Sequence, residues 1–197
     1  MKILAIGDFH GDTQMAKKAA ERADKEKVDL VVICGDITQD GITTDNLVGA
    51  FKQKVLLVPG NHEGNDIADF LAERYGGKNL HGYAYRIDNL GFFGCGSANV
   101  GQFGLTETEI FDTLKKGAKY TKDCRKKIMV THVHPKGTLM AKFSNFVPGS
   151  EGVKKAIEEF HPDILFCSHV HEAEGIEEKI GNTTVINVGR KGKIIEL

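Results

Sequence analysis

Histidines, carboxylates and one asparagine recur along the chain in short polar clusters, each of which follows an apolar run. The clusters are Asp8-Phe9-His10, Gly35-Asp36, Gly60-Asn61-His62-Glu63, Thr131-His132-Val133-His134 and Ser168-His169-Val170-His171. They offer carboxylate oxygens, an amide oxygen and imidazole nitrogens, and no thiolate. This donor set is typical of Mn, Fe, Co, Ni or Zn sites rather than of an all-oxygen calcium site or a structural zinc site built from cysteines. The clusters therefore indicate a transition-metal centre.

The spacing inside two of the clusters lets paired side chains contact the same ion. Residues at positions i and i+2 of an extended segment point in the same direction. We therefore expect Asp8 and His10 to act together, and His169 and His171 to do the same.

Two of the clusters begin with a glycine. Gly35 precedes Asp36, and Gly60 precedes Asn61. A glycine allows a sharp turn out of a strand and a close approach of the backbone to a ligand. We expect these turns to direct the following side chain over the edge of a sheet.

The elements that must position the clusters follow from the hydrophobic pattern. The expected strands are 2–7, 29–34, 54–59, 83–88, 91–96, 127–132, 163–168, 175–181, 183–189 and 192–197, and the expected helices are about 13–27, 43–51, 66–75, 106–118 and 150–160. The alternation of strands and helices in the first third predicts a parallel sheet. Each cluster then lies at the carboxyl end of a strand, where α/β sheets bind ligands.

The middle and the end of the chain add an antiparallel component. A tight turn at 89–91 is expected to join residues 83–88 and 91–96, and the last three strands are expected to form hairpins. Apolar runs such as LVVIC must be covered on both faces. The pattern predicts an α/β fold, a four-layer αββα sandwich of two mixed β-sheets flanked by helices, in a single domain over 1–197.

Composition limits the protein's surroundings and partners. The 197 residues are 41% hydrophobic and carry a net charge of −1, which favours a globular domain without general attraction to nucleic acid or anionic membranes. The cysteines are widely spaced, and the chain shows neither a signal-peptide pattern nor an apolar run long enough to span a membrane. We expect a cytoplasmic protein with reduced cysteines. The sequence does not distinguish a monomer from a homo-oligomer.

The order of the motifs is similar to that of a known family. Asp-x-His, Gly-Asp, Gly-Asn-His-Glu, His and a final x-His-x-His together resemble the calcineurin-like metallophosphoesterase superfamily, from Asp8 to His171. Residues 96–109, with HVHPKGT, PGSEGVKKAI and SHVHEAEGI, are similar to a small single-domain branch that includes cyclic-nucleotide phosphodiesterase-like members. Five spaced motifs in order are a specific signal.

The resemblance implies a role for each matching residue. One metal ion would be bound by Asp8, His10 and His171, the other by Asn61, His132 and His169, with Asp36 bridging both and His62 outside the metal shell as the proton donor to the leaving group. Such a pair of divalent ions, with Mn favoured and Fe, Ni, Co or Zn as alternatives, activates water for attack on phosphorus. Glu63 would orient His62 or its loop.

The chain departs from the family pattern at several positions. Ser168 stands where the family usually has glycine, so its side chain is expected to crowd the site or weaken one metal. Residues 37–41 lack the arginine that related protein serine/threonine phosphatases carry there, and Pro59 replaces the arginine before Gly-Asn-His-Glu. Without a guanidinium clamp for a phosphomonoester, a phosphodiester is favoured.

The function expected from the sequence is hydrolysis of a small phosphodiester or nucleotide. The alternatives are a phosphomonoesterase and a non-catalytic scaffold with the same fold. The chain is too short and too little basic for a nuclease with an added DNA-binding domain. A lysine-rich stretch at 115–127 is interpreted as a solvated helix face, because aromatic residues are nearly absent from it.

The segment 134–148 is long for a connection in a compact domain and is a candidate substrate-facing loop. His134 shares the direction of His132 in an extended segment, which leaves open a role beside the site or a solvated position. Phe143, Asn145 and Phe146 are suited either to line a base or aryl pocket or to pack the loop against the body.

Overall fold

The computed structural model describes residues 1–39, 41, 43–143 and 147–197. Its helices are α1 (Thr13–Lys25), α2 (Asn65–Arg74), α3 (Glu107–Ala118) and α4 (Glu151–Phe160), with 3-10 turns η1 (Val48–Ala50), η2 (Met140–Lys142) and η3 (His171–Ala173). Over these described ranges, no helix is long and apolar enough to cross a membrane.

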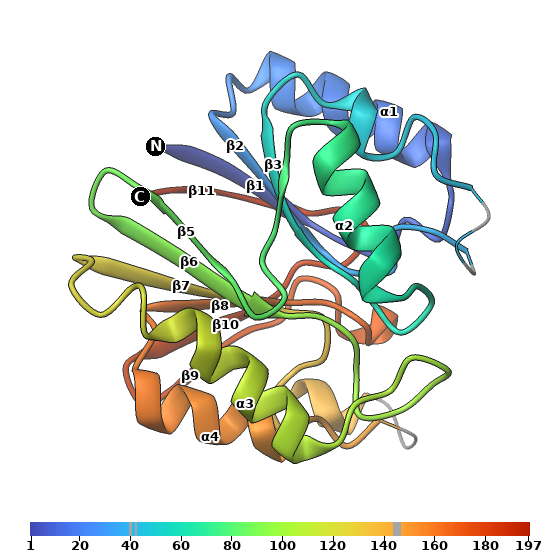
Figure 1. Ribbon diagram of the computed structural model, residues 1–197. Coiled ribbons are helices and arrows are strands. Elements are labelled where there is room, and N and C mark those ends of the chain that lie inside the picture. Colours follow the sequence, from blue (N-terminus) through green and yellow to red (C-terminus); the bar gives the residue numbers. More distant parts are fainter. Residues whose placement is uncertain (40, 42, 144–146) are drawn as a thin grey trace.

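The described strands form two mixed sheets (Figure 1). The first sheet has the order β11-β1-β2-β3-β4, made of β11 (Lys193–Glu196), β1 (Lys2–Ile6), β2 (Leu30–Cys34), β3 (Lys54–Val58) and β4 (Lys78–Asn79). The second has the order β5-β6-β7-β8-β10-β9, made of β5 (Ala84–Ile87), β6 (Leu90–Cys95), β7 (Lys126–Thr131), β8 (Ile164–Cys167), β10 (Thr183–Asn187) and β9 (Glu177–Ile180).

Helices cover the outer face of each sheet, as Figure 1 shows for α1 and α2 over the first sheet and for α3 and α4 over the second. Alternate residues of β1 divide between two cores: Leu4 packs under the helices, whereas Ile3 packs between the sheets with Phe92 and Phe166 of the second sheet. Because both faces of the central strands are buried, their sequences are apolar throughout. The predicted αββα sandwich is confirmed.

Side chains cap the helices where the sequence predicts their ends. Asp12 accepts a hydrogen bond from the backbone N–H of Met15 at the start of α1. Thr106 and Glu109 form a capping box at the start of α3. Such caps satisfy backbone donors that have no partner within the helix. The Asp12 cap starts α1 two residues after His10, the last residue of the first polar cluster.

The predicted helix at 43–51 is wrong. Within the described residues of this stretch, only the 3-10 turn η1 at Val48–Ala50 forms. Asn46 has a φ of 59°, in the left-handed region, which an α-helix cannot contain. Leu47 and Val48 are nevertheless buried, so their apolar character reflects packing of an irregular segment.

Two expected connections also differ from the structure. The β5–β6 hairpin turns at Asp88 and Asn89, because Ile87 pairs with Leu90. Gly91 lies in the strand, where an added Cβ would come 2.7 Å from Thr121 Cβ. The glycine at 91 therefore reflects close packing and not a turn.

The last strand, β11, pairs antiparallel with β1 in the first sheet, whereas only β9 and β10 form the expected hairpin.

Candidate metal centre

The polar clusters converge at the carboxyl ends of parallel strands from both sheets. Asp36 follows β2 and Asn61 follows β3 in the first sheet, whereas His132 follows β7 and His169 follows β8 in the second. The strands of each sheet run parallel here, so the loops after them meet at one edge of the sandwich. The second sheet completes a site that neither sheet forms alone.

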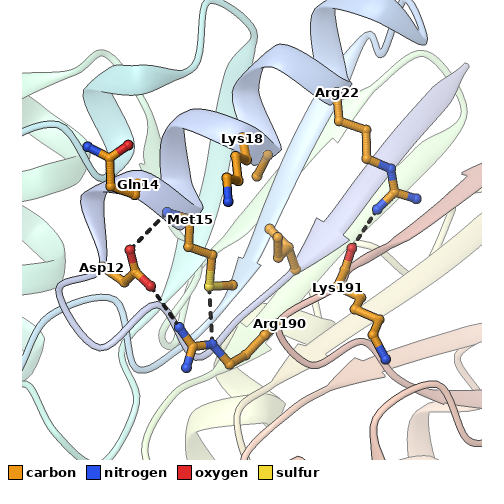
Figure 2. Close-up of a pocket in the computed structure, with 9 residues that line it drawn as sticks. Asp12, Gln14, Met15, Lys18, Arg22, Arg190 and Lys191 are labelled. Carbon is orange, nitrogen blue, oxygen red and sulfur yellow. Dashed lines mark hydrogen bonds and ion pairs between the residues drawn. The ribbon is translucent and has the colours of Figure 1, made fainter.

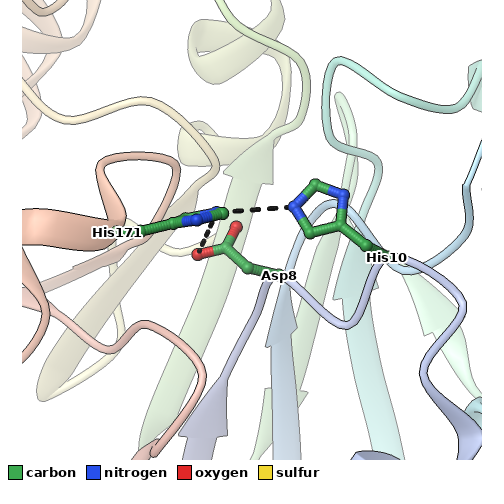
Figure 3. A group of neighbouring side chains, drawn as sticks. All are labelled: Asp8, His10 and His171. Atoms are coloured by element: carbon green, nitrogen blue, oxygen red, sulfur yellow. Dashed lines mark hydrogen bonds and ion pairs between the residues drawn. The ribbon is translucent and has the colours of Figure 1, made fainter.

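One group of donors, which we call the outer site, consists of Asp8, His10 and His171 (Figure 3). Their donor atoms lie within 4.8 Å of one another. His10 Nε2 is 3.4 Å from His171 Nε2, which is 3.7 Å from Asp8 Oδ2. The Asp8 side chain is fully buried, whereas that of His171 is 48% exposed. This side of the centre is therefore reachable from solvent.

A second group, the inner site, consists of Asn61, His132 and His169. His132 Nε2 lies 3.0 Å from Asn61 Oδ1 and 3.0 Å from His169 Nδ1. The other ring nitrogen of His132, Nδ1, donates to the carbonyl oxygen of Cys34 at 2.8 Å. This bond fixes the ring and leaves Nε2 as the donor atom, as is usual for metal-binding histidines.

The separations between these atoms fit a metal ion. Two ligands each about 2.1 Å from an ion, at the angles of octahedral or tetrahedral coordination, lie about 3.0–3.4 Å apart. The inner-site contacts of 3.0 Å and the His10–His171 contact of 3.4 Å lie in this range, and the His171–Asp8 contact of 3.7 Å is slightly longer. Where no proton lies between two such atoms their lone pairs repel each other, and a cation at their centre removes that repulsion. The donor set thus suits divalent ions.

Asp36 connects the two sites through a single oxygen. Its Oδ2 is 3.6 Å from His10 Nε2 and 3.3 Å from His132 Nε2. Its Oδ1 accepts a hydrogen bond of 3.1 Å from the backbone N–H of His62. One carboxylate oxygen is thereby held by the protein, and the other faces both groups.

His62 lies next to the outer site. Its ring packs edge-on against His10, with ring centroids 4.9 Å apart. One of its ring nitrogens lies within 4.8 Å of the His10 and Asp36 donor atoms. All eight side chains singled out in the sequence are therefore brought together. Their individual roles stay predictions.

Four non-glycine residues of the clusters have left-handed backbones. Asp8, His10, Asp36 and His169 have φ values of 55°, 48°, 48° and 71°. The extended segments expected for Asp8-Phe9-His10 and Ser168-His169-Val170-His171 are thus wrong, although both members of each pair reach the site. Non-glycine residues pay a conformational cost in this region, and such strain gathers at functional sites.

Gly35 and Gly60 are required by close packing. A Cβ on Gly35 would come 2.6 Å from His132 Nδ1, and one on Gly60 would come 1.9 Å from Asp36 Oδ1. Gly35 also has a φ of 88°, in the left-handed region. Any side chain at either position would displace residues of the centre, as the sequence predicts for these turns.

Burial and charge oppose each other at His132. Burial disfavours the imidazolium form, but the neighbouring carboxylates of Asp36 and Asp8 outweigh burial and raise the pKa of His132 to about 9. Burial would raise the pKa of Asp36, yet the charges of His132, His10 and His62 hold this pKa below its usual range. Burial, together with the charge of His132, lowers the pKa of His169 to about 3. Without metal, His132 and Asp36 form an ion pair.

We predict that metal binding to the inner site releases a proton from His132. At about pH 7.5 the His132 imidazole of the metal-free protein carries its proton, whereas His169 is already neutral, so about one proton leaves on binding. Calorimetric titration with Mn²⁺ in buffers of different ionisation enthalpy measures this number. The release should fall to about half near pH 9 and decline further at higher pH, and no proton release at about pH 7.5 would contradict the ion pair.

Glu63 ties two of the metal-site loops together. Its buried carboxylate accepts hydrogen bonds from the backbone N–H groups of Ile37 at 3.1 Å, Thr38 at 3.0 Å and Gly60 at 2.6 Å. The loop after β2 is thus fixed to the loop after β3, which carries Asn61. Of the two roles expected for Glu63, orienting His62 or orienting its loop, the contacts in the structure support the second.

A brace that the sequence analysis missed joins the outer-site loops to the chain after β10. Glu174, just beyond η3, accepts backbone hydrogen bonds from Arg190 at 2.7 Å and Lys191 at 2.9 Å. The Arg190 guanidinium contacts Asp12 at 3.0 Å, two residues after His10 (Figure 2). The loops that carry His10 and His171 are therefore linked through Arg190. These contacts join residues far apart in sequence, and no local pattern indicates them.

The pocket drawn in Figure 2, about 370 Å³ in volume, lies against α1 and is lined by Arg22, Arg190 and Lys191. These three cations have partners within the protein. Arg22 donates to the Lys191 carbonyl oxygen, and Lys191 Nζ lies 3.0 Å from Glu174. The charged groups Arg190 and Lys191 therefore belong to the contacts that link the outer-site loops.

The long loop starts at a histidine in the interior of the protein. His134 is fully buried, its ring nitrogens have no hydrogen-bond partner, and burial lowers its pKa to about 4. The solvated alternative for His134 is wrong. Phe143 is 53% exposed, and Asn145 and Phe146 lie outside the described residues.

A comparison with known families identifies the chain. The profile of the calcineurin-like phosphoesterases, Metallophos, matches residues 1–173. The chain belongs to this family. It is a metallophosphoesterase whose histidine and aspartate clusters make a two-metal site plausible. An uncharacterized protein of Methanocaldococcus jannaschii is 32% identical over 99% of this metallophosphoesterase and 91% of its own length.

Solved structures share the fold of this metallophosphoesterase at low sequence identity. The Thermus thermophilus protein TT1561 is 18% identical, with a TM-score of 0.75 over 95% of this chain and 88% of its own. A dimetal phosphatase from Danio rerio is 14% identical, with a TM-score of 0.61 over 96% and 87%. A protein described as a novel archaeal phosphodiesterase is 19% identical, with a TM-score of 0.56 over 96% and 84%.

Proposed function

We propose that this metallophosphoesterase hydrolyses a small phosphodiester or nucleotide at a dinuclear centre. Asp8, His10 and His171 bind the outer ion, and Asn61, His132 and His169 bind the inner ion. Asp36 bridges the two ions, and His62 is the proton donor. Mn²⁺ is the favoured metal, because the ligands combine carboxylate and amide oxygens with imidazole nitrogens.

The observation that carries the proposal is the position of Asp36 Oδ2. It lies 3.6 Å from His10 Nε2 of the outer site and 3.3 Å from His132 Nε2 of the inner site. A carboxylate oxygen between two groups of imidazoles is suited to bridge two cations. Two bound ions would lower the pKa of a water and neutralise the attacking and leaving oxygens of an in-line displacement.

The protein's own residues bind the ions and move one proton. Glu63 holds the Asp36 and Asn61 loops together and so fixes the relative position of these two side chains. His62 lies on the accessible side with His10 and donates its ring proton to the leaving oxygen of the substrate. An imidazole is suited to this step, since its ordinary pKa lies near neutral pH.

A diester is favoured over a monoester by what surrounds Asp36. The residues after it and Pro59 before Gly60 provide no guanidinium to pair with a second negative charge on phosphate. Arg190 is already paired with Asp12. The archaeal structural neighbour described as a phosphodiesterase agrees with this preference, whereas the Danio rerio protein is described as a phosphatase.

The test is hydrolysis of bis-p-nitrophenyl phosphate and of p-nitrophenyl phosphate by the purified protein with Mn²⁺. The proposal predicts cleavage of both with a higher kcat/KM for the diester. A strong preference for the monoester would assign a phosphomonoesterase instead. Failure to cleave either ester with Mn²⁺, Fe²⁺, Co²⁺, Ni²⁺ or Zn²⁺ would favour the non-catalytic scaffold.

A further inference from the structure

Ser168 makes a direct contact with an outer-site residue. It lies between β8 and His169, its side chain is fully buried, and its hydroxyl donates a short hydrogen bond to Asp8 Oδ2. The same oxygen faces His171 Nε2 at 3.7 Å. The hydroxyl therefore contacts the carboxylate oxygen that points into the outer site.

The second Asp8 oxygen has its own contact with the same loop. The backbone N–H of His169 lies 3.4 Å from Asp8 Oδ1. Both oxygens of the carboxylate are thus approached by donors from residues 168 and 169. A carboxylate held in this way keeps one orientation, and the contact extends across 160 positions of sequence.

The space for the Ser168 side chain is provided by Gly7. A Cβ on Gly7 would come 2.7 Å from Ser168 Oγ and 3.0 Å from Ser168 Cβ. Gly7 does not have the positive φ that would require glycine for conformational reasons. Its lack of a side chain instead leaves room for the hydroxyl. Residues 7 and 168 therefore share one buried volume beside Asp8.

We propose that Ser168 is a positioning residue for the outer metal ion, accommodated by the absence of a side chain at Gly7. It orients Asp8 by donating to Oδ2, the oxygen that faces His171 of the outer site. This inference rests on the proposed two-metal function. The sequence leads to the expectation that Ser168 crowds the site. In the structure Gly7 leaves room for the Ser168 side chain, which instead orients Asp8.

The first test compares Mn²⁺ binding to the wild-type protein and to Ser168→Ala by calorimetric titration with metal analysis of the dialysed protein. Hydrogen-bond partners of metal ligands typically contribute about 10–100-fold to metal affinity. We expect Ser168→Ala to lower the affinity for one of the two Mn²⁺ ions by about 10-fold or more and to leave the affinity for the other unchanged. If Ser168 had a purely structural role, the substitution would lower the melting temperature or lower both Mn²⁺ affinities together.

Thr131 supplies the matched control. It precedes His132 as Ser168 precedes His169, and it is equally buried, but its hydroxyl donates to the carbonyl oxygen of Val133 at 2.7 Å. Thr131→Val removes a buried hydroxyl without touching a ligand. Both binding constants should stay at their wild-type values in this variant.

The shared volume is tested by exchanging the two residues. Gly7→Ser alone should lower the melting temperature, because the new Cβ meets the Ser168 hydroxyl. Ser168→Gly empties that volume, so the double variant Gly7→Ser/Ser168→Gly should regain stability relative to Gly7→Ser. A Gly7→Ser protein that melts and binds metal as the wild type does would overturn the steric part of the inference.

Two failures can be told apart. If the wild-type protein binds two Mn²⁺ ions and Ser168→Ala leaves both affinities unchanged, the role of Ser168 is refuted and the proposed function stands. If the wild-type protein does not bind two ions, the dinuclear function itself is refuted, and the inference falls with it.

Discussion

His62→Ala lowers turnover of an alkyl phosphodiester by about 100-fold or more while both metal ions stay bound, because only the proton transfer to the leaving oxygen is removed. The expectation follows from the position of His62 against His10, on the side of the centre where His171 is exposed. Steady-state kinetics with Mn²⁺, together with metal analysis of the dialysed variant, measures both parts.

The leaving group provides a sharper readout of the same variant. A p-nitrophenolate leaves as a stabilised anion and needs little protonation, whereas an alkoxide needs a proton as the bond breaks. His62→Ala should therefore impair an alkyl phosphodiester much more than bis-p-nitrophenyl phosphate, and added imidazole should restore part of the lost rate. Equal loss on both substrates, or loss of metal, would argue against His62 as the proton donor.

Asp36→Ala is expected to empty or scramble both metal sites. Its Oδ2 faces His10 and His132 at 3.6 and 3.3 Å, so its removal takes a ligand from each ion and leaves the imidazoles without a carboxylate between them. Metal analysis after dialysis should find substantially fewer than two tightly bound ions, and turnover should fall with them. Retention of two tight ions would refute the bridging role.

Asp8→Ala is the matched comparison for that variant. Asp8 is also a buried carboxylate of the centre, but its Oδ2 faces the outer site through His171 at 3.7 Å. We expect this variant to lose the outer ion and to keep the inner one. The contrast between one lost ion and two separates a bridging ligand from a terminal ligand.

The sequence predicts the layers of the fold because each depends on local patterns. Buried apolar runs such as Val31–Ile33 belong to the central strands, and capping residues such as Asp12 and Thr106 begin the helices. It fails at 43–51, where apolar residues pack from an irregular segment and Asn46 adopts a left-handed conformation. It also fails for β11, whose partner β1 lies at the other end of the chain.

The donor residues of the centre are predictable because their chemical types and their places after strands are local features. The contacts that hold them are not. Glu63 reaches back to Ile37 and Thr38, Ser168 reaches Asp8, and Arg190 reaches Asp12 across 178 positions. Glu63 finds its partners within the first sheet, whereas Ser168 finds Asp8 only when the two sheets pack, so the positioning of the centre emerges from the tertiary structure.

The central claim is that two ions share Asp36. The most direct measurement is anomalous diffraction from crystals of the wild-type protein soaked in Mn²⁺. Our account predicts two manganese peaks about 3.5–4 Å apart, one beside Asp8, His10 and His171 and the other beside Asn61, His132 and His169, with Asp36 between them. A single peak, or a second peak away from Asp36, would contradict it.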